Sequence, residues 1–169
     1  MTAASGGGAI TVRAARSPAD MDAARALFLA YADSLDFDLC FQGFDAEMAR
    51  FPGEYTPPDG ALLLAVRTAD DTALGVVGLR RYDDRTAEMK RLYLDPAARG
   101  TGAGRRLATA IVAEARRLGY QRLCLDTVAT MTAAIHTYRE LGFRQVDGPV
   151  DGAAKAGSPD LLYFVLDLT

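Results

Sequence analysis

The residues best suited to chemistry form a glycine-rich segment, Arg99–Gly104 (RGTGAG), between an expected strand and an expected helix. Its three glycines remove the side chains that would keep a large anion away, and glycine readily adopts the positive φ angles that such a turn needs. The first N–H groups of a helix have no partner inside the helix and lie at the positive end of its dipole. The segment therefore predicts a binding site for a phosphate or pyrophosphate.

Two common phosphate-binding motifs do not fit this segment. A P-loop needs Lys followed by Ser or Thr after its last glycine, whereas Arg105 and Arg106 follow here. The dinucleotide fingerprint G-x-G-x-x-G needs a glycine at position 105. The remaining pattern is R-x-x-G-x-G, formed by Arg99, Gly102 and Gly104.

The 169 residues have the length of one domain, which we assign to residues 10–169, with residues 1–9 as a frayed leader. Helix and strand patterns alternate, which predicts an α+β architecture with a mixed sheet of about seven strands flanked by helices. The expected strands are 10–13, 61–67, 74–82, 88–94, 122–128, 143–146 and 161–168.

Two helix starts have recognisable signals. Ser17 and Asp20 have the spacing of a capping box, ahead of an apolar stripe. Thr130 is positioned to cap a helix over residues 131–141. The strand at 88–94 has charged residues on both faces, which is typical of a bulged strand beside a site or of an edge strand.

Composition excludes several classes of protein. Half of the residues are apolar, 24% are charged and the formal net charge is −3, which argues against a dedicated nucleic-acid binder. Cys40 and Cys124 have no companions at ligand spacing, which indicates a reducing compartment rather than a disulfide framework or a zinc site. No apolar run has the length that spans a bilayer. We expect a cytoplasmic protein.

Taken together, three segments resemble the GNAT N-acetyltransferase family. Arg99–Gly104 resembles its acetyl-CoA pyrophosphate motif, and strand 88–94 precedes that motif. Downstream, Ala134, Tyr138 and Leu141–Phe143 match its A-x-x-x-Y-x-x-L-G-F helix. The order of elements is similar over nearly the whole chain. The resemblance implies a mostly antiparallel seven-stranded sheet with about four helices, in which strands 88–94 and 122–128 splay apart.

The resemblance also implies a cofactor site without a metal. Backbone amides of the glycine-rich segment would bind the pyrophosphate of acetyl-CoA, and strand 92–94 would bond its pantetheine arm. An amide near Leu94 would polarise the thioester carbonyl. The implied cofactor-binding residues are Leu92, Tyr93, Leu94, Arg99, Gly100, Thr101, Gly102, Ala103, Gly104 and Arg105.

Two residues match catalytic positions of the family. Glu88 lies eleven residues before Arg99, where many members carry a glutamate general base, and Tyr138 matches the tyrosine that protonates the leaving thiolate. A carboxylate can take the proton that an alkylamine must lose before it attacks a thioester. Each residue also has a simpler interpretation, Glu88 as a solvated strand charge and Tyr138 as core packing.

Other positions are less informative. Met131 stands where many members carry an asparagine that bonds the cofactor or a strand. We interpret His136 as a surface residue, and Cys124 as an inert core residue. The acceptor site of the family corresponds to residues 31–51 and 147–160. The first of these segments contains acidic and aromatic residues that suit a cationic amine, namely Asp36, Phe37, Asp38, Phe41 and Phe44.

These observations predict an acetyl-CoA-dependent N-acetyltransferase that acts directly on the primary amine of a small molecule. Its partners would be acetyl-CoA and an amine acceptor, without nucleic acid or membrane, and the chain could pair with a second copy as a homodimer. Acetylation of a protein lysine or N-terminus is the alternative substrate class. A non-catalytic acyl-CoA sensor is the alternative of another kind.

Overall fold

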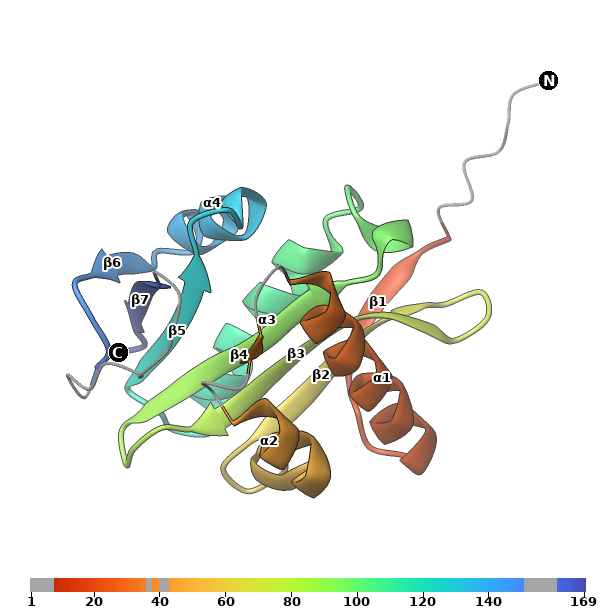
Figure 1. Cartoon of the computed structure of the whole chain (residues 1–169), viewed down its shortest axis with the longest axis horizontal. Helices are drawn as coiled ribbons and strands as arrows, with labels where there is room; N and C mark the ends of the chain where they lie inside the picture. Colours follow the sequence, from red (N-terminus) through yellow and green to blue (C-terminus); the bar gives the residue numbers. More distant parts are fainter. Residues whose placement is uncertain (1–7, 36–37, 40–42, 151–160) are drawn as a thin grey trace.

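The computed structural model describes residues 8–35, 38–39, 43–150 and 161–169, and within them one seven-stranded sheet (Figure 1). The strand order is β1-β2-β3-β4-β5-β7-β6, and every neighbouring pair is antiparallel except β4 and β5. The strands are β1 (Ile10–Ala14), β2 (Ala61–Arg67), β3 (Thr72–Arg81), β4 (Thr86–Leu94), β5 (Arg122–Val128), β6 (Arg144–Val146) and β7 (Leu161–Asp167). The helices are α1 (Pro18–Ser34), α2 (Phe44–Arg50), α3 (Ala103–Arg117) and α4 (Thr132–Glu140), with short 3-10 turns η2 (Gly53–Tyr55) and η3 (Pro96–Ala98).

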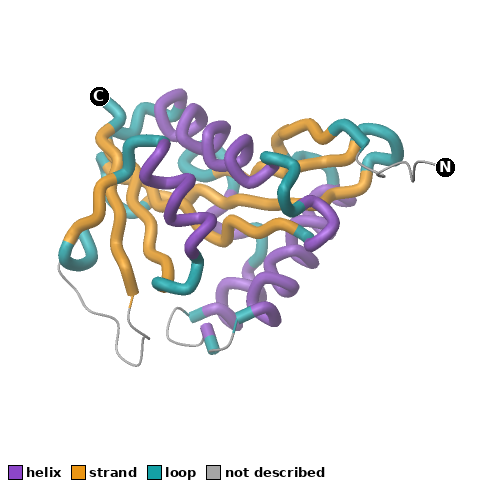
Figure 2. The backbone as a smooth tube through the Cα atoms, turned by 90° about the horizontal axis from the view of Figure 1, so that it is seen from above, coloured by secondary structure: helices purple, strands orange, loops and turns teal. Residues whose placement is uncertain are grey.

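Helices cover both faces of the sheet (Figures 1 and 2). One hydrophobic core lies between the sheet and helices α3 and α4, and it includes Ala87 and Met89 of β4. A second core lies between the sheet and helices α1 and α2. Because successive side chains of a strand point to opposite faces, Glu88 and Lys90 face the α1 and α2 side of β4.

β4 and β5 separate part of the way along their length. They pair in parallel only from Thr86 with Arg122 to Glu88 with Cys124, although both strands continue further. The separation coincides with a bulge in β4, where Gly78 of β3 pairs with Lys90 but Val76 pairs with Tyr93. Two residues of β4 thus oppose one residue of β3, and the β4 edge after the bulge has no partner among the described strands.

The sequence predicted most element positions correctly. Strands 61–67 and 122–128 have the predicted bounds, and Ser17 and Asp20 form the predicted capping box. The bulge in β4 confirms the distorted-strand interpretation of its charges. The predicted cap at Thr130 is wrong: the Met131 N–H bonds to the Val128 carbonyl, so the helix starts one residue later and without a side-chain cap.

Within the described residues, no helix has both the length and the apolar character that crossing a membrane requires.

Candidate active site

The glycine-rich segment forms an open turn at the start of α3. Gly100 and Gly102 have φ angles of 77° and 81°, and a Cβ atom at either position would meet nothing within 4 Å. Gly104 was predicted as the last residue of the turn, but the helix already begins at Ala103, so Gly104 lies inside its first turn, and a Cβ there would lie 3.3 Å from Leu94 Cδ1. The backbone of the turn is therefore accessible to a ligand.

The amides of this turn are available to an anion. Within the described part of the chain, the N–H groups of Gly100, Gly102, Gly104 and Arg105 donate to no protein acceptor. Thr101 fixes the turn, because its hydroxyl donates to the Ala98 carbonyl at 2.5 Å and accepts from the Ala103 N–H at 3.3 Å. A cluster of free amides at the positive end of a helix fits a pyrophosphate.

Arg105 lies next to these amides on the surface. Its guanidinium bonds to Glu140 of α4, so the first turn of α3 is tied to the last turn of α4. Half of the Arg105 side chain is exposed, which leaves it accessible to a phosphate.

Residues Leu92–Leu94 lead from the bulge to the turn. They pair with β3 on one side, and beyond Glu88 the other side of β4 has no bonded strand among the described residues. An extended ligand with amide groups can bond such an edge as an added strand does. Leu94 packs under Gly104, so this edge ends at the glycine turn.

Glu88 lies where β4 and β5 begin to separate. It is buried and is the last residue of β4 to pair with β5. Its Oε1 accepts a hydrogen bond from Arg80 Nε at 2.9 Å and forms an ion pair with Arg80 Nη2 at 2.8 Å, and its Oε2 lies 3.9 Å from Lys90 Nζ. Burial lowers the pKa of Lys90 to about 8, against the opposing effect of Glu88. The interpretation of Glu88 as a solvated strand charge is wrong, because this carboxylate is desolvated and held between two cations.

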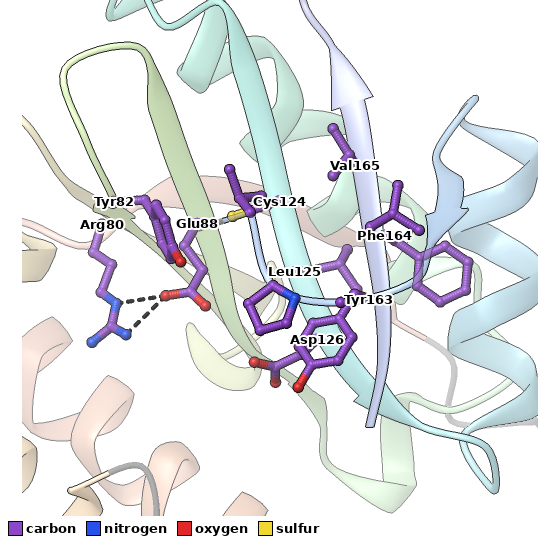
Figure 3. Close-up of a pocket in the computed structure, with 13 residues that line it drawn as sticks. Arg80, Tyr82, Glu88, Cys124, Leu125, Asp126, Tyr163, Phe164 and Val165 are labelled. Carbon is purple, nitrogen blue, oxygen red and sulfur yellow. Dashed lines mark hydrogen bonds and ion pairs between the residues drawn. The ribbon is translucent and has the colours of Figure 1, made fainter. Parts of the chain in front are cut away.

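A cavity of about 290 Å³ opens beside Glu88 (Figure 3). Arg80 and Tyr82 line it from β3 and the turn that follows, and Asp126 and Tyr163 line it from β5 and β7. The cavity therefore contains two carboxylates, one guanidinium and two phenols. The remaining lining residues are Cys124, Leu125, Val146, Gly148, Pro149, Val150, Phe164 and Val165.

Tyr138 lies on α4, on the other side of the sheet from α1 and α2. Its ring is buried, with ring centres 5.7 Å from Phe143 and 6.2 Å from Phe164. Burial first, and then the charges of Tyr31 and Asp126, raise the pKa of Tyr138. A phenol in this environment keeps its proton at neutral pH, as a proton donor must. Its ring also contributes to the core, so both interpretations of Tyr138 agree with its position.

Several other predicted residues have clear positions. His136 is exposed and pairs with Glu140 at 3.0 Å, which fits a surface residue. Cys124 is buried, and burial raises the pKa of its thiol, which keeps it unreactive. Phe44 lies buried under the Arg91 guanidinium, and Asp38 is exposed. Cys40 and the predicted acceptor residues Asp36, Phe37 and Phe41 lie outside the described residues, as does segment 151–160.

Sequence reasoning missed three residues around Glu88. Arg80 is its cross-strand partner, Asp126 is the second acid of the cavity, and Glu47 of α2 lies 4.0 Å from Arg80. Asp126 had a signal in the sequence, since it follows the apolar run Leu123–Leu125 and lies two residues after Cys124, so the two side chains face the same side of the strand. Arg80 and Glu47 had no such signal in the sequence, because only the fold brings β3 and α2 next to Glu88. Among the described residues, no group of three acids, histidines or cysteines is arranged to hold a metal ion.

The chain is similar in sequence and in fold to acetyltransferases. Residues 25–143 match the family model "Acetyltransferase (GNAT) family". An uncharacterized N-acetyltransferase of Schizosaccharomyces pombe is 35% identical over 139 residues, which cover 82% of this chain and 85% of that protein. The mycothiol acetyltransferase of Nocardia farcinica is 36% identical over 89 residues, 51% of this chain and 29% of that protein.

Solved structures share the fold. A GNAT-family acetyltransferase from Staphylococcus aureus has a TM-score of 0.75 at 16% identity, covering 95% of this chain and all of that one. The structure of yncA from Salmonella typhimurium, determined with its cofactor acetyl-CoA, has a TM-score of 0.68 at 21% identity, covering 96% of this chain and 95% of that one. With the splayed β4–β5 pair and the open glycine turn, the family match leads to one conclusion: this chain belongs to the GNAT family of acetyltransferases.

Proposed function

We propose that this protein transfers the acetyl group of acetyl-CoA to the primary amine of a small molecule bound in the cavity beside Glu88. One observation carries the proposal: β4 joins two half-sites, the cavity beside Glu88 on the acceptor side and the glycine turn on the cofactor side. At one end, Glu88 lines the cavity; at the other, Leu94 touches the glycine turn through Gly104. A ligand bonded along the open edge of β4 would lie between these two points.

The cofactor-binding residues follow from this arrangement. The free amides of Gly100, Gly102, Gly104 and Arg105 would hold the pyrophosphate, and the β4 edge at Leu92–Leu94 would bond the pantetheine arm. Bound acetyl-CoA supplies an acetyl group activated as a thioester. Binding two substrates side by side is worth up to about 7–11 kcal/mol of the barrier when they are well aligned.

Glu88 and Tyr138 would move the protons. An alkylamine reaches the cavity as an ammonium ion, and Glu88 Oε2 would accept its proton, directly or through a water molecule. The Arg80 guanidinium holds the other carboxylate oxygen, which fixes the direction of Glu88. Tyr138 would donate its hydroxyl proton to the departing thiolate. We propose direct transfer without an acyl-enzyme, because Cys124, the one described cysteine, is buried and its thiol pKa is raised, which makes it a poor nucleophile.

The cavity favours a small acceptor. Its volume of about 290 Å³ matches the lower end of ligand pockets, and Asp126 adds a second negative charge that suits a cationic amine. Its described walls come from β3, β4, β5, β6 and β7.

The test is release of free coenzyme A thiol across a panel of small primary amines. Glu88→Gln should lower kcat about 100-fold or more on any amine that turns over, with unchanged affinity for coenzyme A. Glu54→Gln is the matched control, because Glu54 also bonds Arg80, at 3.3 Å, but is exposed and outside the cavity. Tight coenzyme A binding without turnover would contradict the proposal in favour of a sensor, and turnover only on peptides in favour of a protein acetyltransferase.

A further inference from the structure

Arg91 has an unusual backbone conformation at the β4 bulge. Its φ angle is +61°, in the left-handed region that residues with a side chain rarely occupy. It is the first of the two β4 residues that lie between the pairs Lys90–Gly78 and Tyr93–Val76, so this conformation makes the bulge. The bulge turns β4 away from β5 and frees the edge that would bond the cofactor arm. Something must offset the strain of a non-glycine residue here.

The Arg91 side chain is held by α2. It is almost completely buried, and its Nε and Nη2 donate to the two oxygens of Glu47 at 3.2 and 3.3 Å. The guanidinium carbon lies 5.1 Å from the ring centre of Phe44, one turn earlier on the same helix. A forked ion pair with an aromatic contact fixes both the position and the orientation of an arginine.

Glu47 is itself fixed from a second direction. The Tyr55 hydroxyl donates to its Oε1 at 3.0 Å. The Tyr55 ring lies against Gly78, where a Cβ atom would come within 2.7 Å of the ring. Gly78 is the β3 residue that pairs with Lys90, directly before the bulge. Glu47 therefore connects α2, η2 and both strands at the point where the bulge begins.

We propose that Glu47 is a positioning residue that holds the β4 bulge in place through Arg91, and so keeps the cofactor edge of β4 open. The charge of Glu47 retains the Arg91 guanidinium inside the protein, and this retention keeps the backbone in its left-handed conformation. Only the expected effect on coenzyme A rests on the function proposed above.

Three variants separate the backbone effect from the loss of an ion pair. Glu47→Gln should weaken coenzyme A binding about tenfold in calorimetry, because Arg91 loses its charged partner. Adding Arg91→Gly should restore affinity to within about twofold, since glycine adopts a positive φ without strain. Adding Arg91→Ala instead should leave binding weak, because alanine removes the same charge but not the strain.

Hydrogen exchange of the ligand-free protein gives an independent readout. The amides of Lys90 and Tyr93, which flank the bulge, should exchange about tenfold faster in Glu47→Gln and in the alanine double variant, but not in the glycine one.

If Glu47→Gln does not fold, recovery of folding by glycine and not by alanine supports the proposal. Wild-type behaviour of Glu47→Gln, or equal behaviour of the two double variants, overturns it. If the wild type fails to bind coenzyme A, the proposed function fails, and exchange alone decides the role of Glu47.

Discussion

The two half-sites at the ends of β4 are built from different materials. The glycine turn offers main-chain amides, and its three glycines lie within five consecutive residues. The acceptor side offers charged side chains that are buried or, for Arg80, half-buried. They are Glu47, Arg80, Glu88, Lys90 and Arg91 on α2, β3 and β4, and each is within 4.0 Å of another. One half-site is local in sequence and close to solvent, whereas the other is assembled from distant residues.

This difference determines what each half-site is sensitive to. The turn depends on backbone conformation and on empty space, so steric changes should damage it while pH should not. The buried charges depend on one another, since a charge in the interior is tolerated only when it is paired. Changes at Glu88 and Lys90 should alter pH dependence and catalysis more than affinity for the cofactor, whereas Glu47 and Arg91 act on the cofactor edge through the β4 bulge.

The largest effect is expected at the turn. Gly102→Val places a branched side chain at a φ of 81°, in the space that a pyrophosphate would occupy. Affinity for coenzyme A should fall about 100-fold or more, as measured by calorimetry.

Gly119→Val is the matched control for this change. Gly119 follows the other end of α3, has a φ of 89° and also has nothing within 4 Å of an added Cβ. Both variants should therefore lose similar stability, by about 1–3 kcal/mol, but only Gly102→Val should lose coenzyme A binding. Equal affinities of the two variants would remove the turn from the cofactor site.

The contrast also explains what the sequence could predict. The glycine spacing and the apolar faces of the elements are local patterns, so the order of helices and strands along the chain and a helix after the glycine turn could be predicted from them. The bulge itself had a local sign in the charges on both faces of strand 88–94.

The partners of Glu88 and Arg91 could not be predicted in this way. Arg80 is eight residues from Glu88 and Glu47 is 44 residues from Arg91, and only the folded register brings them together. A charged residue in a sequence is interpreted as solvent-exposed when its partner is unknown. For this reason the sequence also allowed the wrong interpretation of Glu88 as a solvated strand charge. The cap at Thr130 failed for a smaller reason, since one extra turn bond at Met131 moved the helix start.

The second-largest effect is expected at Lys90, in the buried charges of the acceptor side. Lys90 is buried and its pKa is lowered to about 8, from an ordinary 10.5. Its charged form is therefore destabilised in the folded protein, and the unfolded chain binds more protons between pH 8 and 10.5. The free energy of unfolding should rise with pH across this window, by about 3 kcal/mol in total from Lys90.

Lys90→Met isolates this contribution. Tyrosines and Cys124 have raised pKa values in the folded state, so they lower stability as pH rises, and they do so in both proteins. The difference between urea denaturation of wild type and of Lys90→Met, measured from pH 7 to 10, should therefore change with pH. Parallel stability curves would mean that Lys90 is not a desolvated cation, whereas Gly102→Val should give curves parallel to wild type.

The smallest effect is expected at Tyr138 of α4. Its hydroxyl has no hydrogen-bond partner within the described residues, so Tyr138→Phe should leave thermal stability nearly unchanged. If the phenol protonates the leaving thiolate, kcat should fall about tenfold, because a thiolate leaves fairly well without help, and affinity for coenzyme A should stay the same.

Tyr120→Phe gives the opposite pattern, since that hydroxyl donates to the Asp59 carbonyl at 2.7 Å, away from the site. It should lose about 1 kcal/mol of stability and no activity. A Tyr138→Phe enzyme with full kcat would assign Tyr138 to the core alone, and the proton for the thiolate would then have to come from solvent at the open edge of β4.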